Sequence, residues 1–253
     1  MTNEGETNRI VGHVVGVINA ATEYQRPFYH LQLANVFPAD VYSALLEAMP
    51  QKEDYRQMSG RTKFTRTNDG SGTRTKIDLF PEQIRHLPHE KKSVWMAIGK
   101  VLRSTEVREA FRRRLASSLE KRFGPDYTSV GMYPIPILTR DVPGYRISVH
   151  PDTRWKGMTV QLYLPRDRSI EHVGTVFHKR ISETSFEKVL QMSFSPNTGY
   201  AFAVGQDTYH SVDTVGPEVQ TRDSILLTYF VDRTPLQVVR NRMRRLGNFV
   251  LKG

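Results

Sequence analysis

The sequence contains no cysteine, and this absence excludes two kinds of chemistry. With no Cys among 253 residues, neither a disulfide bond nor a thiolate metal ligand can form. No apolar run approaches the roughly 20 residues that a membrane-spanning helix needs. The first residues lack a positive stretch followed by an apolar segment, so we expect no secretory signal and a cytoplasmic location.

Internal repeats and low-complexity tracts are also lacking, and the length suits one large domain with a substantial core. The pair Gly70 and Gly72 follows no β-rich run and opens no helix, so it is not a dinucleotide-binding fingerprint. We expect a single domain, 1–253, in three parts. These are a helical and mixed support region over 1–126, a catalytic core over 127–232, and a basic helix or tail over 233–253.

Positive charge is in clear excess. The formal net charge is +10 and the pI is about 9.8, which favours anionic partners but also fits an ordinary basic surface. Basic residues gather in the polar stretch 56–76, which predicts either a mobile loop over an active site or a plain solvated loop. The segment Leu236 to Leu251 predicts a basic amphipathic helix, either packed on the core or used at an anionic surface.

The pattern of apolar residues predicts helices first and strands later. Residues 7–36 favour short extended segments, while helices are expected over 38–49, 91–103 and 105–123. From Tyr127 onward the chain changes to short strands separated by turns, which is typical of a β-sandwich or closed jelly roll. Pro134 and Pro136 make the segment from Val130 to Leu138 an edge or irregular strand. The expected fold class is therefore mainly β with N-terminal helices, an α+β arrangement.

One short stretch, Tyr145 to Asp152, carries the strongest chemical signal. If it begins as a strand, His150 and Asp152 point to the same face, because side chains alternate with a period of two. His210 is the best candidate for a third ligand. Two histidines and one carboxylate leave positions on a metal open, which is the arrangement of non-haem Fe(II) oxygenases.

A cation follows at a suitable distance along the chain. Arg222 lies twelve residues after His210 (222 − 210 = 12) and shares a strand face with Ser224. A guanidinium is always charged and can hold a carboxylate through two parallel hydrogen bonds.

Together these residues resemble the Fe(II)/2-oxoglutarate-dependent dioxygenases, in particular the prolyl-hydroxylase-like branch. The resemblance covers about residues 130–232. It implies a double-stranded β-helix core (a cupin-like jelly roll) braced by helices, and it implies Fe(II), 2-oxoglutarate as cosubstrate, and O2. The motifs that carry it are His150-x-Asp152, Tyr163-Leu164-Pro165, Gly174-Thr175, His210 and Arg222-x-Ser224.

The resemblance also implies a role for each site residue. The catalytic and metal-ligating residues are His150, Asp152 and His210. The cosubstrate-binding residues are Arg222, Ser224 and Tyr163, with Thr159 and Gln161 on the same strand face as Tyr163. Candidates for substrate contact flank the first motif and are Tyr145, Arg146, Arg154 and Trp155.

The implied reaction is hydroxylation of an unactivated C–H bond with release of succinate and CO2. The expected substrate is a small, anionic metabolite such as an amino acid, a sugar or a natural-product intermediate. A peptide or protein hydroxylase and a non-catalytic basic module that binds an anionic polymer are the alternatives. Cupin isomerases and cofactor-independent dioxygenases share the fold, but usually show a denser His/Glu cluster. Asp152 disfavours a halogenase, and Thr228 stands where the nucleic-acid demethylating branch has a second Arg, which disfavours nucleic acid.

Overall fold

The computed structural model describes residues 4–58, 70 and 72–232. The predicted basic helix or tail at 233–253 lies outside the described residues, as do 59–69 and 71 of the predicted basic loop. The ends of that loop are strands rather than loop, Arg56–Gln57 and Arg74–Asp78. Among the described helices, none is long and apolar enough to cross a membrane.

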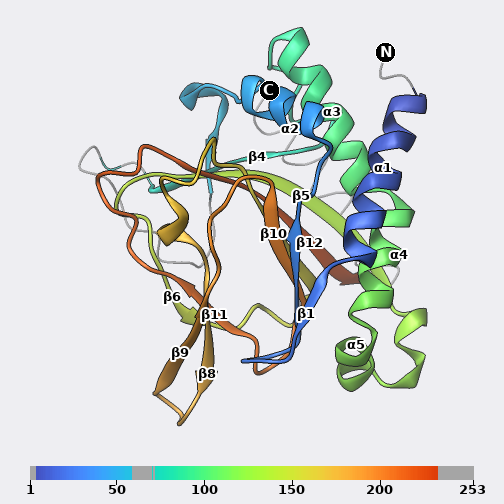
Figure 1. Ribbon diagram of the computed structural model, residues 1–253, viewed down its shortest axis with the longest axis vertical. Helices are drawn as coiled ribbons and strands as arrows, with labels where there is room; N and C mark the ends of the chain where they lie inside the picture. Colours follow the sequence, from blue (N-terminus) through green and yellow to red (C-terminus); the bar gives the residue numbers. More distant parts are fainter. Residues whose placement is uncertain (1–3, 59–69, 71, 233–253) are drawn as a thin grey trace.

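Two antiparallel sheets form the centre of the molecule (Figure 1). In spatial order the larger sheet holds β1 (Thr22–Tyr24), β2 (His30–Ala34), β10 (Thr198–Ala203), β7 (Lys156–Tyr163), β12 (Arg222–Asp232), β5 (Gly131–Asp141), β4 (Arg74–Asp78) and β3 (Arg56–Gln57). The smaller sheet holds β6 (Ile147–His150), β11 (Tyr209–Val212), β8 (Val176–Arg180) and β9 (Phe186–Gln191). The eight strands from β5 to β12 are divided equally between the two sheets. Four of them are adjacent in the larger sheet, in the order β10-β7-β12-β5, and the other four form the smaller sheet, in the order β6-β11-β8-β9. This eight-stranded, two-sheet arrangement is a jelly roll, so the predicted fold class is confirmed.

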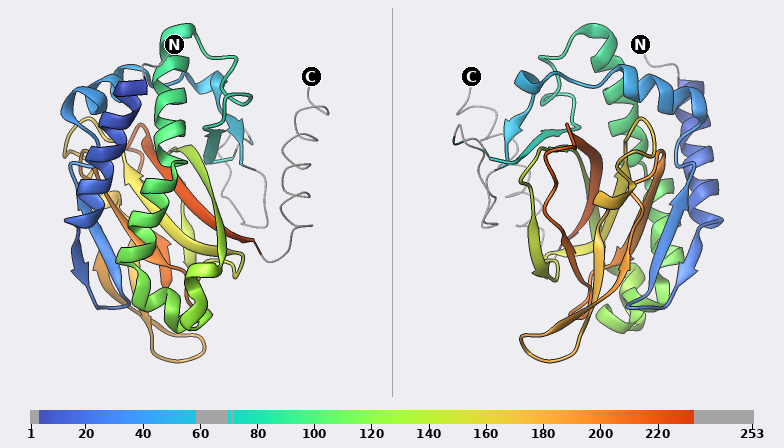
Figure 2. Two further views of the ribbon diagram at one scale, coloured as in Figure 1. Left: turned by 90° about the vertical axis from the view of Figure 1, so that its right-hand side faces the viewer. Right: turned by 60° about the vertical axis from the view of Figure 1, so that its left-hand side comes forward.

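Helices cover the outer face of the larger sheet (Figure 2). They are α1 (Glu4–Asn19), α2 (Ala39–Glu47), α3 (His89–Leu102), α4 (Thr105–Arg114) and α5 (Ala116–Phe123), with short 3-10 helices at Lys52–Asp54, Pro125–Ser129 and Glu171–Val173. The helix predicted over 105–123 is divided at Leu115, which is fully buried. The other two predicted helices correspond to α2 and α3.

The prediction of extended structure at the start of the chain was wrong for residues 7–19, which belong to α1. The β-branched residues there lie at helical rather than alternating spacing, and the buried ones are Thr7, Ile10, Val14 and Ile18. Burial of this stripe against the other helices outweighs the weak preference of β-branched residues for strands. Helix α1 packs on α3 and α4.

Strand β5 explains how two prolines fit into the larger sheet. Over residues 137–141 it pairs with both β4 and β12, whereas over 131–136 it pairs with β12 alone. Pro134 and Pro136 lie in this second part. Proline cannot donate a ladder hydrogen bond, so it is tolerated where one side of the strand has no partner. The predicted edge strand is therefore correct for this half of β5.

The apolar core has two layers. One lies between the helices and the larger sheet, with Trp95, Phe111 and Leu227 among its buried members. The other lies between the two sheets and is rich in aromatic rings, including Tyr163, Phe194 and Phe202. Polar side chains on the inner face of the larger sheet border this second layer, and these build the candidate site.

Candidate active site

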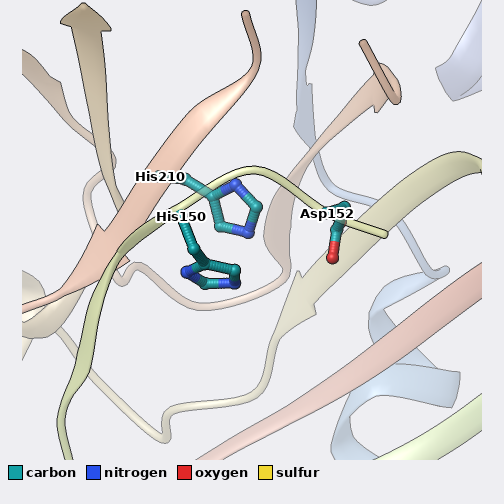
Figure 3. A group of neighbouring side chains, drawn as sticks. All are labelled: His150, Asp152 and His210. Carbon is teal, nitrogen blue, oxygen red and sulfur yellow. The ribbon is translucent and has the colours of Figure 1, made fainter. Parts of the chain in front are cut away.

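Strands β6 and β11 bring the two predicted histidine ligands side by side. His150 and His210 are direct partners in the ladder, and their ring centroids are 4.5 Å apart. Asp152 follows β6 by two residues. One ligand atom from each of the three residues lies within 4.8 Å of the other two (Figure 3). The three residues predicted from spacing therefore form a group that could hold a metal ion.

The backbone fixes the tautomer of both rings. His150 Nδ1 lies 2.8 Å from the carbonyl oxygen of Ser148, and His210 Nδ1 lies 3.1 Å from that of Thr208. A carbonyl oxygen only accepts, so each Nδ1 donates, and in a neutral ring Nε2 keeps its lone pair. Burial lowers the pKa of His210 to about 4, so its ring is neutral at pH 7. Two oriented imidazoles beside a carboxylate are a fitting donor set for Fe(II).

Asp152 is ionised and held from two sides. Lys156 Nζ lies 2.5 Å from its Oδ1, and Thr159 Oγ1 donates to Oδ2 over 2.7 Å. Burial raises the pKa of Asp152, but the charge of Lys156 and these hydrogen bonds outweigh that effect and hold the pKa well below its usual range. Each carboxylate oxygen has two lone pairs, so one remains to bind a metal while these contacts persist.

Polar side chains continue from Asp152 along the inner face of β7, beginning with Thr159, which donates to Asp152. Thr159, Gln161 and Tyr163 alternate along this face, as predicted, and all three are buried. Gln161 Nε2 donates to Ser224 Oγ over 2.7 Å. Tyr163 donates its hydroxyl to Thr175 Oγ1 over 3.1 Å and accepts from the backbone N–H of the same residue over 3.1 Å. A continuous polar strip thus crosses an otherwise aromatic layer.

Arg222 lies at the far end of this strip and is fully buried. Its Nε donates to the carbonyl oxygen of Val173 over 2.7 Å, and its Nη1 donates to Asp141 Oδ2 over 2.8 Å. The guanidinium lies 4.8 Å from the ring centroid of Phe194 and 5.8 Å from that of Tyr163. Its Nη2 is buried and has no hydrogen-bond partner among the described residues. A buried N–H of a cation without a partner is costly, so this group is available to an anionic ligand.

The four residues that flank the first motif are divided between interior and surface. Tyr145 is fully buried between the sheets, while Arg146 and Arg154 are exposed. Trp155 is 44% exposed, and the Arg154 guanidinium lies 4.7 Å from its ring centroid. The last three are thus accessible to a substrate from solvent, whereas Tyr145 is not.

Sequence reasoning missed several polar residues of the site. Asp141 lies outside every motif found in the sequence, and Arg74 is one of several basic residues in the 56–76 stretch. Lys156 and Tyr200 also belong to no motif, although Tyr200 is fully buried and donates to Thr175 Oγ1 over 3.1 Å. The two-residue spacing of Tyr200 and Phe202, which is typical of a strand, is the signal that could have indicated Tyr200.

One hollow on the surface lies away from these residues. It has a volume of about 320 Å³ and lies beside β3 and β4, where Arg56, Lys76 and His86 contribute to its lining. None of the predicted site residues lines it. The candidate site is therefore defined by its side chains and not by this hollow.

Similar proteins were found only among solved structures. No protein-family model matches the chain, and no curated protein matches it. A prolyl-4-hydroxylase from Pseudomonas putida is 16% identical over 86% of this chain and 98% of its own, with a TM-score of 0.49. A Trichoplax adhaerens prolyl hydroxylase in complex with a hypoxia inducible factor oxygen degradation domain peptide fragment is 12% identical over 89% and 91%, with a TM-score of 0.48. A 2OG-Fe(II) oxygenase family oxidoreductase from Burkholderia pseudomallei is 14% identical over 91% and 93%, with a TM-score of 0.47.

Proposed function

We propose that the protein is a non-haem Fe(II)- and 2-oxoglutarate-dependent dioxygenase that hydroxylates its substrate. One observation carries the proposal. A His-Asp-His group with both Nε2 atoms available lies at one end of the polar strip on β7, and a buried arginine with an unpartnered N–H lies at the other. This pairing suits a ligand with a chelating end and a carboxylate end, which describes 2-oxoglutarate.

The site residues would have two separate roles, holding the metal and binding the cosubstrate. His150, Asp152 and His210 would hold the iron, with the imidazole Nε2 atoms oriented by backbone carbonyls. Arg222 would bind the distal carboxylate of 2-oxoglutarate through Nη2. When bound, the iron supplies the oxidative chemistry that converts 2-oxoglutarate, O2 and a C–H bond into succinate, CO2 and C–OH. The aromatic layer between the sheets would exclude water from the buried arginine.

The other polar residues would shape the cosubstrate pocket rather than bind the metal. Ser224 accepts from Gln161 over 2.7 Å and contacts Thr139 Oγ1 at 2.9 Å, so its hydroxyl is already placed within a network. Tyr163 would complete the pocket beside Arg222, since the two side chains are in contact. Thr159 would orient the metal-ligating carboxylate through its 2.7 Å hydrogen bond. In this proposal residues 127–232 are the catalytic core and 1–126 support it.

For the substrate we propose a small anionic metabolite. Two exposed cations that flank the His-x-Asp motif in the sequence support this, namely Arg146 and Arg154. A screen of amino acids, acidic sugars and short peptides for substrate-stimulated succinate release tests the choice. Stimulation only by peptides would replace the metabolite with a peptide or protein residue.

The oxygenase assignment is tested by anaerobic titration of 2-oxoglutarate into the Fe(II)-loaded protein. A weak visible charge-transfer band from the iron chelate should appear in the wild type and vanish in His210→Ala. The exposed His172, which contacts Glu218 at 3.2 Å, provides a matched control, and His172→Ala should keep the band. Absence of iron binding and of the band in the wild type would refute the oxygenase and favour a basic module, whose polymer binding would be salt-sensitive and independent of metal.

A further inference from the structure

A row of three charged residues crosses the larger sheet at the cosubstrate end of the site. Arg74, Asp141 and Arg222 are direct partners on the adjacent strands β4, β5 and β12. Arg74 donates from Nε to Asp141 Oδ1 over 2.5 Å and from Nη2 to Oδ2 over 2.7 Å. Arg222 Nη1 donates to the same Oδ2 over 2.8 Å. The Asp141 carboxylate therefore accepts hydrogen bonds from both guanidinium groups.

The charge of this row does not balance. Two guanidiniums and one carboxylate leave one positive charge (2 − 1 = +1), and Arg222 and Asp141 are fully buried while Arg74 is 9% exposed. Burial lowers the pKa of Arg74, but the attraction of Asp141 more than offsets it and keeps the pKa above its ordinary value. A buried net charge is unfavourable unless a counter-ion accompanies it.

Two donors in this cluster remain open. Arg222 Nη2 and the Tyr145 hydroxyl are buried and lack a hydrogen-bond partner among the described residues. Tyr145 belongs to the cluster, because the Arg74 guanidinium lies 4.1 Å above its ring centroid. One missing negative charge and two open donors match one carboxylate group.

A neighbouring row provides the contrast. Arg140 and Asp223 are the next residues along β5 and β12, and they are also direct partners. Their 2.7 Å ion pair is neutral overall, and it lies on the helix side, where Arg140 also donates to the Pro50 carbonyl oxygen over 3.2 Å. Neither side chain has a buried polar atom without a partner. The excess charge is thus particular to the row that faces the site.

We propose that Arg74 and Asp141 set the charge of the cosubstrate pocket. Asp141 orients Arg222 but alone would cancel its charge and repel a carboxylate. Arg74 neutralises Asp141, so that Arg222 presents a full positive charge, with the Tyr145 hydroxyl as a second donor to the same carboxylate. Arg74 is a positioning residue, and it comes from the N-terminal region outside the motifs. The inference rests on the proposed use of 2-oxoglutarate.

The test measures how much the distal carboxylate contributes to the affinity for the ligand. Isothermal titration calorimetry on the Mn(II)-loaded protein would compare 2-oxoglutarate with 2-oxovalerate, which replaces the distal carboxylate by a methyl group. The ratio of their dissociation constants measures the preference for the carboxylate. Arg74→Met leaves a neutral row, so this preference should fall about tenfold or more, because the pocket no longer has an excess positive charge for the second carboxylate of the ligand.

The double variant gives the decisive outcome. Arg74→Met with Asp141→Asn restores a net charge of +1, and the preference should return to within about threefold of the wild type. Arg74→Lys, which keeps the charge, should also retain most of it. The control pair Arg140→Met with Asp223→Asn should lower the melting temperature without changing the preference. A preference unaltered by Arg74→Met, or lost equally in the double variant, would overturn the inference.

Folding and function are separated by two further measurements. Thermal denaturation establishes that each variant is folded, and Arg74→Gln, which can still donate to Asp141, replaces Arg74→Met if the latter does not fold. If the wild type binds neither 2-oxo acid, the proposed function fails, and the same variants are compared for thermal stabilisation by glutarate, which lacks the chelating end. The charge inference then holds if glutarate stabilises the wild type and the double variant but not Arg74→Met, and fails otherwise.

Discussion

Acidification should destabilise the metal-free protein through His210. This side chain is buried, and burial lowers its pKa in the folded protein to about 4, compared with about 6.5 for an unperturbed histidine. Between these two pH values the unfolded chain binds a proton that the folded chain does not. The stabilising contribution of the neutral ring is therefore complete above about pH 6.5 and is lost as the pH falls toward the folded pKa.

The size of the effect follows from the two pKa values. From pH 7 to pH 5 the linkage relation gives a loss of about 2 kcal/mol from this one residue. That is a considerable part of the 5–15 kcal/mol by which domains are typically stable. Burial also lowers the pKa of His30 and of His178, so the wild type should lose more than His210 alone accounts for.

Urea denaturation with a metal chelator present measures the effect. The difference in unfolding free energy between pH 7 and pH 5 should be about 2 kcal/mol smaller in His210→Asn than in the wild type, since asparagine does not titrate. The exposed His172 again gives a control, and His172→Asn should lose as much stability as the wild type. Parallel losses in the wild type and His210→Asn would refute the idea that His210 is buried in its neutral form.

Three further changes test the contacts around the site. Lys156→Met should lower the melting temperature of the metal-free protein, because Asp152 loses its ion pair. The same change should increase the rise in melting temperature that Mn(II) produces, because a cation that competes for Asp152 is gone. A smaller rise would contradict the proposed role of Asp152. Thr159→Val should weaken Mn(II) binding about tenfold in calorimetry, and unchanged affinity would show that its hydrogen bond does not orient the ligand. Gly174→Ala should lower the free energy of unfolding by about 2 kcal/mol or more in urea denaturation, because the added Cβ would overlap the carbonyl oxygen of Met192. Gly16→Ala in α1 is the control. A Cβ at Gly16 would meet open space, so this change should not destabilise the protein.

Sequence spacing was informative wherever a feature is local. The two-residue spacing of His150 and Asp152 correctly predicted that they lie together, although Asp152 lies just beyond the end of β6. Strand alternation places Thr159, Gln161 and Tyr163 on one face of β7. The change from helical to strand patterning near Tyr127 anticipates the jelly roll. In these cases the information lies within one strand or one helix, where periodicity is a direct consequence of backbone geometry.

The sequence was uninformative where the contact depends on strand register across the sheet. Arg74 lies 67 positions before Asp141, which in turn lies 81 before Arg222, and nothing in their local sequence predicts that they are paired. Similarly, α1 was missed because residues such as Ile10 and Val14 favour strands locally, and only packing on the other helices selects the helix. Tertiary contacts decide both features.

The pairing of β6 with β11 has a consequence for the order of folding. This ladder brings together residues 60 positions apart (210 − 150 = 60), and the intervening chain contains β7, β8, β9 and β10. Closing such a long loop costs chain entropy before the ladder contributes any stability, and contacts of this kind form late. The two histidines therefore come together only after both sheets have begun to assemble. A nascent or partly unfolded chain would not bring His150, Asp152 and His210 together, so under the proposed function it would not hold iron before the sheets assemble.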